Sequence, residues 1–359
     1  MNQKRQLEID IVKGYAILFM VLVHCYEDYG SAAIQTKGFF SHLVFFLGGP
    51  LTPPVFMFCM GVGMVYTHKQ SSRQFIKRGI FLFFLGYVLN FIRDFIPYTI
   101  QSYIQHDTSL FETAKDYLLC TDILPFAGLS YLFIGVFKST RLKDYWLIVF
   151  YAFCAILNVI LLPFKFETRT LASITGLIWG TWDCTWFPFL SWIFFPISGY
   201  LFGKQLITYK DTDQFYRKIL TFTGLLFFPL ITLMYELHID CGALDGYFDM
   251  EYFHMNWFGN FMTLELILLW TGFWHFASET LPSLLKNTLV RWSKELNVFY
   301  IIHWIFIGYG NLVFGYFKHS VIEVLLLFVF TLAASDWITA CFIKRRNLPL
   351  SKPAGSVRR

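Results

Sequence analysis

The sequence predicts an all-α protein: a polytopic membrane helical bundle of about ten transmembrane helices, with the N-terminus and the C-terminus in the cytoplasm. Composition is the first indication. Of 359 residues, 56% are hydrophobic and only 15% are charged, whereas soluble domains carry roughly 25% charged residues. The aromatic content is the second indication, with 43 Phe, 20 Tyr and 11 Trp, as is typical of helices that face lipid and its interfaces. The third is the arrangement of apolar residues in long runs.

The apolar runs divide the chain into candidate spans. A helix needs about 20 apolar residues to cross the ~30 Å hydrocarbon core of a bilayer. By this length, we expect spans near 9–28, 43–66, 79–96, 122–138, 145–163, 188–204, 219–237, 257–278, 297–316 and 321–343. The run at 122–138 is short and contains Pro125. Lys13 interrupts the first run and no small-residue cleavage site follows it, so we expect a retained helix and not a signal peptide.

The positive charges test this division. Segments 1–13, 67–78, 138–144, 204–218, 280–294 and 344–359 hold 23 of the 29 Lys and Arg. Such a bias marks the cytoplasmic side and requires an even number of spans. Because the basic residues lie in short loops between apolar runs, we expect no nucleic-acid partner. The sequence thus predicts a single transmembrane domain over residues 1–343 and a basic cytoplasmic tail over 344–359.

Three longer segments fall on the opposite side, at 97–121, 164–187 and 238–256. Each mixes aromatic residues with polar ones, for example Asp183 beside Trp182. They are either an interfacial aromatic belt or the mouth of a cavity. The seven Cys lack metal-ligand spacing, so no metal site is predicted. Three of them, Cys120, Cys184 and Cys241, fall in these outer segments, where one disulfide remains open.

The first span carries the most informative polar residues. Lys13 and His24 are eleven residues apart, about three helical turns, so they share one face and lie ~16 Å apart along the axis. Glu27 is close enough to orient the imidazole, and Asp28 follows it. Taken singly, Lys13 could snorkel to the inner interface and His24 could lie among headgroups. Their alignment on one face favours a functional pair.

Buried polar residues in later spans are further candidates. Ionisable groups inside a bilayer are costly and mark functional sites by default. Glu265 lies near the centre of its span and His303 follows Tyr300 by three residues; function and structure are equally open for both. Asn90 and Asn158 are better explained by interhelical hydrogen bonds.

The second span and the loop after it contain backbone breakers and cations. Gly48-Gly49-Pro50 and Pro53-Pro54 interrupt the span, and a broken membrane helix is tolerated where it lines protein or a water-filled cavity. Gly61 and Gly63 allow either close ligand passage or tight helix packing. The following loop holds Lys69, Arg73, Lys77 and Arg78. These could bind phosphates at the cytoplasmic face, or simply provide the positive-inside signal.

These motifs resemble those of a known superfamily. The run from Asp10 through Lys13-Gly14 to His24 resembles the opening of the transmembrane acyltransferases, which comprise the acyltransferase-3 enzymes and relatives of heparan-α-glucosaminide N-acetyltransferase. Lys13 stands where arginine is commoner, which replaces a bidentate phosphate binder by a point charge. Four later stretches are similar to the same group: 45–63, 77–87, 192–203, and 293–304 with its Tyr-x-x-His ending.

The resemblance implies transfer of an acyl group, with acetyl as the expected group, from cytoplasmic acyl-CoA to an amine or hydroxyl of a saccharide on the outer side. Acetyl-CoA would be the donor, held by Lys13, Lys69, Arg73, Lys77 and Arg78. His24, Glu27 and His303 would be catalytic, with His24 as general base or transient acyl carrier, and Asp28, Asp183 and Glu265 would bind the acceptor. A bacterial inner membrane is the expected location, and a homodimer is kept open.

A secondary transporter or lipid flippase is the alternative. Glu265, His303 and Asp336 would then be coupling sites, and the broken second span would be a gate. Many transporter folds have corresponding broken helices in two halves, and no such pair is present in this sequence.

Overall fold

The computed structural model describes residues 6–36, 38–68, 70–180, 184–239 and 250–346, and these residues form helices joined by turns, without a named strand. All ten predicted spans contain a helix. Seven helical segments are long and apolar enough to cross a membrane: Leu7–Tyr29, Phe39–Tyr66, Ser72–Gln105, Ile123–Thr140, Thr212–Glu236, Leu296–Phe314 and Val321–Arg346. The protein is thus an all-helical, multi-pass membrane protein, while ten crossings and cytoplasmic termini stay predictions.

The three remaining predicted spans are shorter or more polar. α9 (Tyr145–Leu161) has 17 residues and α12 (Phe194–Thr208) has 15, the latter preceded by the short α11 (Phe189–Trp192). α15 (Trp257–Ala277) has 21 residues, but Asn260 and Glu265 reduce its apolar character. Length and hydropathy alone therefore do not decide whether these three helices cross the membrane completely.

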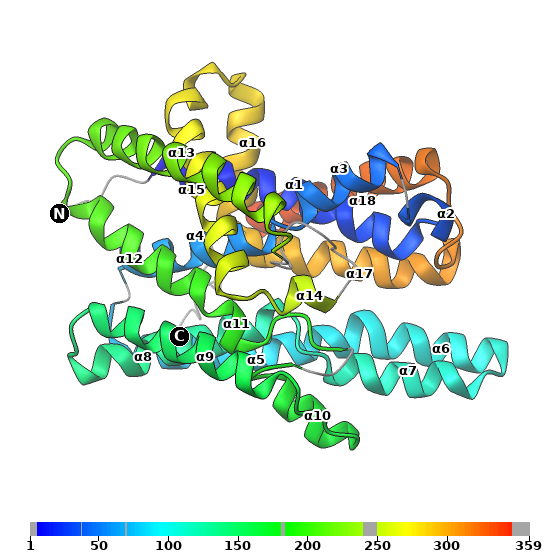
Figure 1. The fold of residues 1–359 in the computed structure, drawn as a ribbon. Helices are drawn as coiled ribbons and strands as arrows, with labels where there is room; N and C mark the ends of the chain where they lie inside the picture. The colour runs from blue at the N-terminus through cyan, green and yellow to red at the C-terminus, as the bar shows by residue number, and fades with distance from the viewer. Residues whose placement is uncertain (1–5, 37, 69, 181–183, 240–249, 347–359) are drawn as a thin grey trace, which may run out of the picture.

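The helices lie largely side by side along one direction (Figure 1). α1 (Leu7–Tyr29) is central: 67% of its apolar window is buried, against 6% for α13 (Thr212–Glu236). A helix buried on all sides belongs to a core, whereas α13 and α18 (Val321–Arg346) have broad apolar surfaces for lipid. α1 packs against α3 (Phe39–Gly48), α15, α16 (Ser283–Lys294), α17 (Leu296–Phe314) and α18.

The second predicted span is broken, as the glycines and prolines indicated. α3 ends at Gly48, and α4 (Pro53–Tyr66) begins with two prolines in its first turn. Between them the Thr52 hydroxyl donates a hydrogen bond to the Leu47 carbonyl at 2.9 Å. Because proline lacks an N–H that the first helical turn would leave unpaired, Pro53 and Pro54 start a helix without loss.

The third predicted span begins earlier and extends further than expected. α5 (Ser72–Asn90) starts at a capping box between Ser71 and Gln74, and continues through the π-helix η1 (Phe91–Phe95) into α6 (Ile96–Gln105). α6 and α7 (Thr108–Leu119) form an antiparallel hairpin that projects at the right of Figure 1. The segment 97–121, predicted to lie outside, is therefore largely helical, and its Tyr98 and Tyr117 line a cavity.

The other helices complete the bundle. α8 packs along α5, α12 along α4, and α13 along α15. The elements not yet given are α2 (Ala32–Gln35), α8 (Ile123–Thr140), α10 (Arg169–Gly176), α14 (Met250–Phe253) and the 3-10 turn η2 (Ser278–Thr280). Arg346 at the end of α18 forms an ion pair with Glu295, and it lines the same cavity as Lys13.

Two of the three cysteines in the segments predicted to lie outside, Cys120 and Cys184, are near each other but form no disulfide bond. Cys120 and Cys184 are free thiols, although the Thr121 amide donates to the Cys184 carbonyl at 3.0 Å. Cys241 lies outside the described residues. This backbone contact links the start of α8, next to Cys120, to the segment before α11, which contains Cys184.

Candidate active site

Two cavities lie along α1 and share a wall. The first, of about 400 Å³, contains His24 and is called the His24 cavity. The second, of about 920 Å³, contains Lys13 and is called the Lys13 cavity. Phe56, Ile123 and Tyr300 line both. The predicted alignment of Lys13 and His24 is therefore confirmed, because α1 is unbroken between them.

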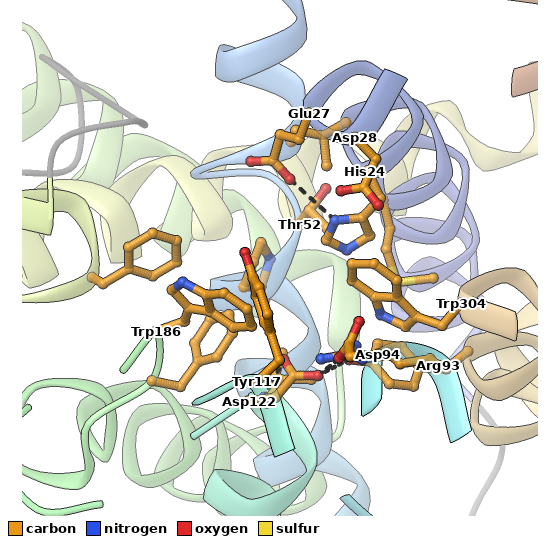
Figure 2. A pocket seen from close by; sticks show the side chains of 18 of the residues that line it. His24, Glu27, Asp28, Thr52, Arg93, Asp94, Tyr117, Asp122, Trp186 and Trp304 are labelled. Carbon is orange, nitrogen blue, oxygen red and sulfur yellow. Dashed lines mark hydrogen bonds and ion pairs between the residues drawn. The ribbon is translucent and has the colours of Figure 1, made fainter. Parts of the chain in front are cut away.

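The last turns of α1 deliver three polar side chains to the His24 cavity. His24 Nδ1 lies 3.2 Å from Glu27 Oε2, the i,i+3 contact that the sequence predicted. Figure 2 shows this contact beside Asp28. The Asp28 carboxylate accepts a hydrogen bond from the Asn311 side-chain amide at 2.9 Å. A carboxylate on one ring nitrogen holds the imidazole in one orientation and strengthens the other nitrogen as a base.

His303 lies behind His24 and not on the cavity wall. Its ring stacks on the His24 ring with centroids 5.6 Å apart, it is fully buried, and Nδ1 lies 3.3 Å from the Phe299 carbonyl oxygen. Trp304, the next residue, does line the cavity, 4.1 Å from the His24 ring. The sequence placed His303 near the site, but this geometry gives it a supporting contact with His24.

Arg93 is the residue that sequence analysis missed as a site residue. Its side chain is 1% exposed and forms ion pairs of 2.8 Å with Asp94 and with Asp122. It also lies over the Trp304 ring, 4.1 Å from the centroid. The π-helix η1 carries Arg93 and Asp94, and such bulges are frequent at functional sites. Gly308 lets α17 approach the backbone of Arg93 closely, because a Cβ at position 308 would lie 2.1 Å from the Arg93 carbonyl oxygen.

A signal for Arg93 was present in the charge distribution, since it is one of six cations outside the cytoplasmic segments. Its partner Asp122 is 29 positions away on the cap of α8. Helix packing brings the two together, and no local pattern predicts that contact. The pair is nevertheless the best-buried ionic contact of the site, and buried charges require such partners.

The rest of the His24 cavity wall is acidic and aromatic. Four carboxylates and one guanidinium are among the described lining residues, together with a set of aromatic rings: Glu27, Asp28, Asp94, Asp122 and Arg93, with Tyr98, Tyr117, Trp186, Trp304 and Tyr316. Tyr98 stacks on Tyr117 and on Tyr316 with centroids 5.3 Å apart in each case. Burial raises the pKa of the Tyr117 hydroxyl, which therefore stays a neutral hydrogen-bonding group.

The Lys13 cavity is lined by cations from several helices. Lys13, Lys77 and Arg78 are there as predicted, whereas Arg73 is exposed on α5 and does not line it. Lys69 lies outside the described residues. Two further cations, Lys294 and Arg346, line the cavity and were not predicted. Lys13 Nζ donates to the Ser293 carbonyl at 3.2 Å, which holds the ammonium at the junction of α1 and α16.

Two further residues were predicted to bind the acceptor. Asp183 lies outside the described residues. Glu265 is buried on α15 and is not among the lining residues of either cavity. The predicted role of Glu265 rested on its burial alone, and burial does not distinguish a cavity from a helix contact.

The glycines of α4 divide between packing and cavity. A Cβ at Gly61 would lie 2.2 Å from the Pro196 carbonyl oxygen, so this glycine lets α4 and α12 approach closely. A Cβ at Gly63 would meet no atom within 4 Å, and Gly63 lines the Lys13 cavity. The packing alternative is therefore confirmed for Gly61, while ligand passage at Gly63 stays a prediction.

Comparison with known families gives one match. The family model described as heparan-α-glucosaminide N-acetyltransferase, catalytic, matches residues 5–234, which is more than half of the chain. The match covers α1 to most of α13, including His24, Arg93 and Asp122, while α15 to α18 follow it. No match to the chain was found among curated proteins.

Proposed function

The chain belongs to the heparan-α-glucosaminide N-acetyltransferase catalytic family and is a membrane acetyltransferase; on that premise, we propose that it uses cytoplasmic acyl-CoA, with acetyl-CoA as donor, to acylate an amine or hydroxyl of a saccharide on the outer side. The proposed location is a bacterial cytoplasmic membrane, where acyl-CoA is available on one side and glycans on the other.

One observation carries the proposal. A single helix, α1, brings a cation into the Lys13 cavity and an imidazole into the His24 cavity, and the two cavities share a wall. A donor that stays on one side of the membrane and an acceptor that stays on the other need such an arrangement. Neither molecule has to cross the protein, because only the acyl group passes between them.

The Lys13 cavity suits the donor. Its volume of about 920 Å³ is within the range of cofactor sites. Lys77 and Arg78 lie one after the other on α5, and Lys294 and Arg346 approach from α16 and α18. Lys and Arg on several elements can bind the separate phosphates of CoA by charge-assisted hydrogen bonds. These cations lie at the end of the bundle that the charge bias assigns to the cytoplasm.

The His24 cavity suits the acceptor and the proton transfer. In the proposed reaction, His24 removes a proton from the acceptor N–H or O–H, with Glu27 orienting the ring. The acceptor atom forms a bond to the acyl carbon and the carbon–sulfur bond of the thioester breaks. CoA leaves as a thiolate, which takes up a proton from the Lys13 cavity. Transfer through an acyl-His24 intermediate has the same overall balance.

The charge of the His24 cavity favours an amine among acceptor classes. Four carboxylates face one guanidinium, so the wall attracts a cationic group. An amine binds as the ammonium, releases one proton to water in the cavity before attack, and gives its second proton to His24 as the bond to the acyl carbon forms. The aromatic rings around the cavity provide flat apolar surfaces for a sugar ring.

The transport alternative has less support in the structure. Asp336 accepts hydrogen bonds from Arg291 at 2.7 Å and from the Trp292 indole at 2.6 Å, so it joins α18 to α16. Glu265 and His303 are not among the lining residues of either cavity. The three proposed coupling residues therefore share neither of these two cavities.

The proposal predicts ligand stabilisation and a His24-dependent activity. Saturating CoA or acetyl-CoA at about 100 times its Kd should stabilise detergent-purified protein by about 2.7 kcal/mol, seen as a higher Tm.

His24→Ala should retain this stabilisation, but its rate of transfer of labelled acetyl to methyl glucosaminide should fall by about 10²- to 10⁴-fold. His42→Ala removes an exposed histidine of α3 that lines neither cavity and serves as the control. No stabilisation by either ligand, or full activity without His24, would refute the proposal.

A further inference from the structure

The wall between the two cavities consists of three bulky side chains from three helices. Phe56 of α4, Ile123 of α8 and Tyr300 of α17 line both cavities. They are 4%, 7% and 6% exposed, respectively. None of them carries a charge, and two are aromatic. An acyl group that passes between a donor in one cavity and an acceptor in the other has to lie against these side chains.

Two of the three wall residues are fixed by one carboxylate. The Tyr300 hydroxyl donates to Asp122 Oδ2 at 2.7 Å, and the Ile123 amide donates to Asp122 Oδ1 at 2.6 Å. Arg93 in turn pairs with Asp122 at 2.8 Å. The side-chain amide oxygen of Asn90 (Oδ1) accepts from the same guanidinium at 3.2 Å. A buried network with these partners holds Tyr300 and Ile123 in position.

Phe56 is fixed in another way. It lies in the first turns of α4, directly after the Pro53-Pro54 start, and its amide donates to the Thr52 carbonyl at 3.0 Å. α4 is held against α12 by the close approach at Gly61 and Gly199, where a Cβ at Gly199 would lie within 2 Å of the Phe58 carbonyl oxygen. The third wall residue therefore belongs to a backbone that cannot easily move aside.

A wall that cannot move limits the size of what lies against it. Acetyl has one methyl on the thioester carbonyl, and each longer acyl chain adds methylenes at the same place. Extra methylenes in a filled apolar site cost about 1–3 kcal/mol each, and one methylene changes enzyme selectivity by about 10- to 200-fold. The attacking acceptor group and the departing CoA thiolate are the same for every acyl chain length.

We propose that Phe56, Ile123 and Tyr300 form an acyl-size filter that restricts transfer to acetyl and other very short acyl groups. This inference rests on the proposed function, because it presupposes a donor in the Lys13 cavity. It assigns specificity for the donor to the shared wall. Arg93 and Asp122 act as positioning residues that hold the filter in place through Tyr300 and Ile123.

Competition between acyl-CoA donors tests the filter. Full-length purified protein is given equal acetyl-CoA and butyryl-CoA with methyl glucosaminide as acceptor, and Kd values for both donors are measured by thermal stabilisation. Two additional methylenes predict a preference of wild type for acetyl of at least about 100-fold in transfer. Phe56→Ala and Ile123→Ala should each reduce that ratio by about tenfold or more, since each removes wall volume.

Met57→Ala is the matched control. Met57 follows Phe56 on α4, is equally buried at 6%, and lines the Lys13 cavity alone. It should keep the wild-type ratio, whatever its absolute rate. Because both donors compete in one preparation, the ratio does not depend on the fraction of folded protein, and Phe56→Leu provides a milder variant.

The outcomes separate the filter from the proposed function. A wild type that is stabilised by acetyl-CoA and transfers acetyl, with the same ratio in the Phe56 and Ile123 variants, would overturn the filter and leave the function intact. An equal shift of the ratio in Met57→Ala would also overturn it, because the effect would then belong to the whole cavity. A wild type that neither binds nor uses either donor would instead refute the proposed function.

Discussion

Around the Lys13 cavity, single positions on one helix decide which cations can reach a ligand. Lys77 and Arg78 line the cavity, and the Arg78 guanidinium lies 5.6 Å from the Tyr131 ring centroid. Arg73, one turn earlier on the same helix, is exposed and does not line it. These residues lie in one loop region of the sequence, and their position along α5 decides which of them line the cavity.

This difference leads to a prediction for CoA affinity. Arg78→Ala should raise the Kd for CoA by about 10- to 100-fold, the equivalent of one charge-assisted hydrogen bond of about 1.5–3 kcal/mol. Arg73→Ala removes the same side chain at an exposed position and should change the Kd by less than about threefold. Thermal stabilisation at increasing CoA concentrations measures both constants. Equal losses in the two variants would contradict the assignment of these two residues.

At this scale, sequence analysis identified contacts within a helix and missed those between helices. His24 with Glu27, and Lys13 with His24 along one face, follow from helical periodicity. The ion pair of Arg93 with Asp122 depends on how α8 packs against α5 and could not be derived from spacing. Glu265 was predicted to bind the acceptor because it is an intramembrane carboxylate, and it lines neither cavity; its role stays a prediction.

Among the elements, the contact between α4 and α12 has the most restrictive geometry. Their backbones meet at Gly61 and Gly199, where no side chain fits. Since α4 carries Phe56 and α1 packs against it, this contact positions one side of both cavities. The small residues thus fix the distance between two helices that lie far apart in the sequence.

The matched glycines of α4 give a stability prediction. Gly61→Ala should lower the free energy of unfolding by about 1–3 kcal/mol, because the added methyl overlaps backbone that cannot relax. Gly63→Ala, two residues later on the same helix, has open space at the new methyl and should be neutral or stabilising by up to ~1 kcal/mol. Thermal unfolding in detergent compares the two variants. An equal Tm would mean that α4 and α12 are less closely held than the structure indicates.

Element boundaries followed the sequence best where the breaks have a local cause. The interruption at 49–52 came from Gly and Pro residues, and the structure confirms it. The α6–α7 hairpin was not predicted, because its residues alternate between aromatic and polar without a long apolar run. It forms through contacts between the two helices and with η1, which hydropathy does not detect.

For the molecule as a whole, the side of the membrane on which each cavity opens is the central prediction. The charge bias places the turn between α8 and α9 in the cytoplasm and the α6–α7 hairpin outside. His106 and Arg141 are exposed residues at these two turns, and both have positive φ angles. α7 and α8 lie between these two residues, and α8 is long and apolar enough to cross a membrane.

Labelling of single cysteines tests this arrangement. In a background without the native cysteines, His106→Cys should react with a membrane-impermeant maleimide on intact cells. Arg141→Cys should react only after the membrane is opened. Reaction of both from the same side would exclude a crossing by α8, and reaction in the reverse order would invert the proposed direction of transfer.

The thin wall between the two cavities also has an electrical consequence. If both cavities admit water, most of a membrane potential falls across Phe56, Ile123 and Tyr300. An acetyl group is neutral and crosses this field without work. In the proposed reaction, however, the acceptor releases a proton on one side and the CoA thiolate takes one up on the other. Each turnover then displaces one elementary charge, worth about 2.3 kcal/mol per 100 mV, so group transfer is coupled to the membrane voltage although no ion is transported.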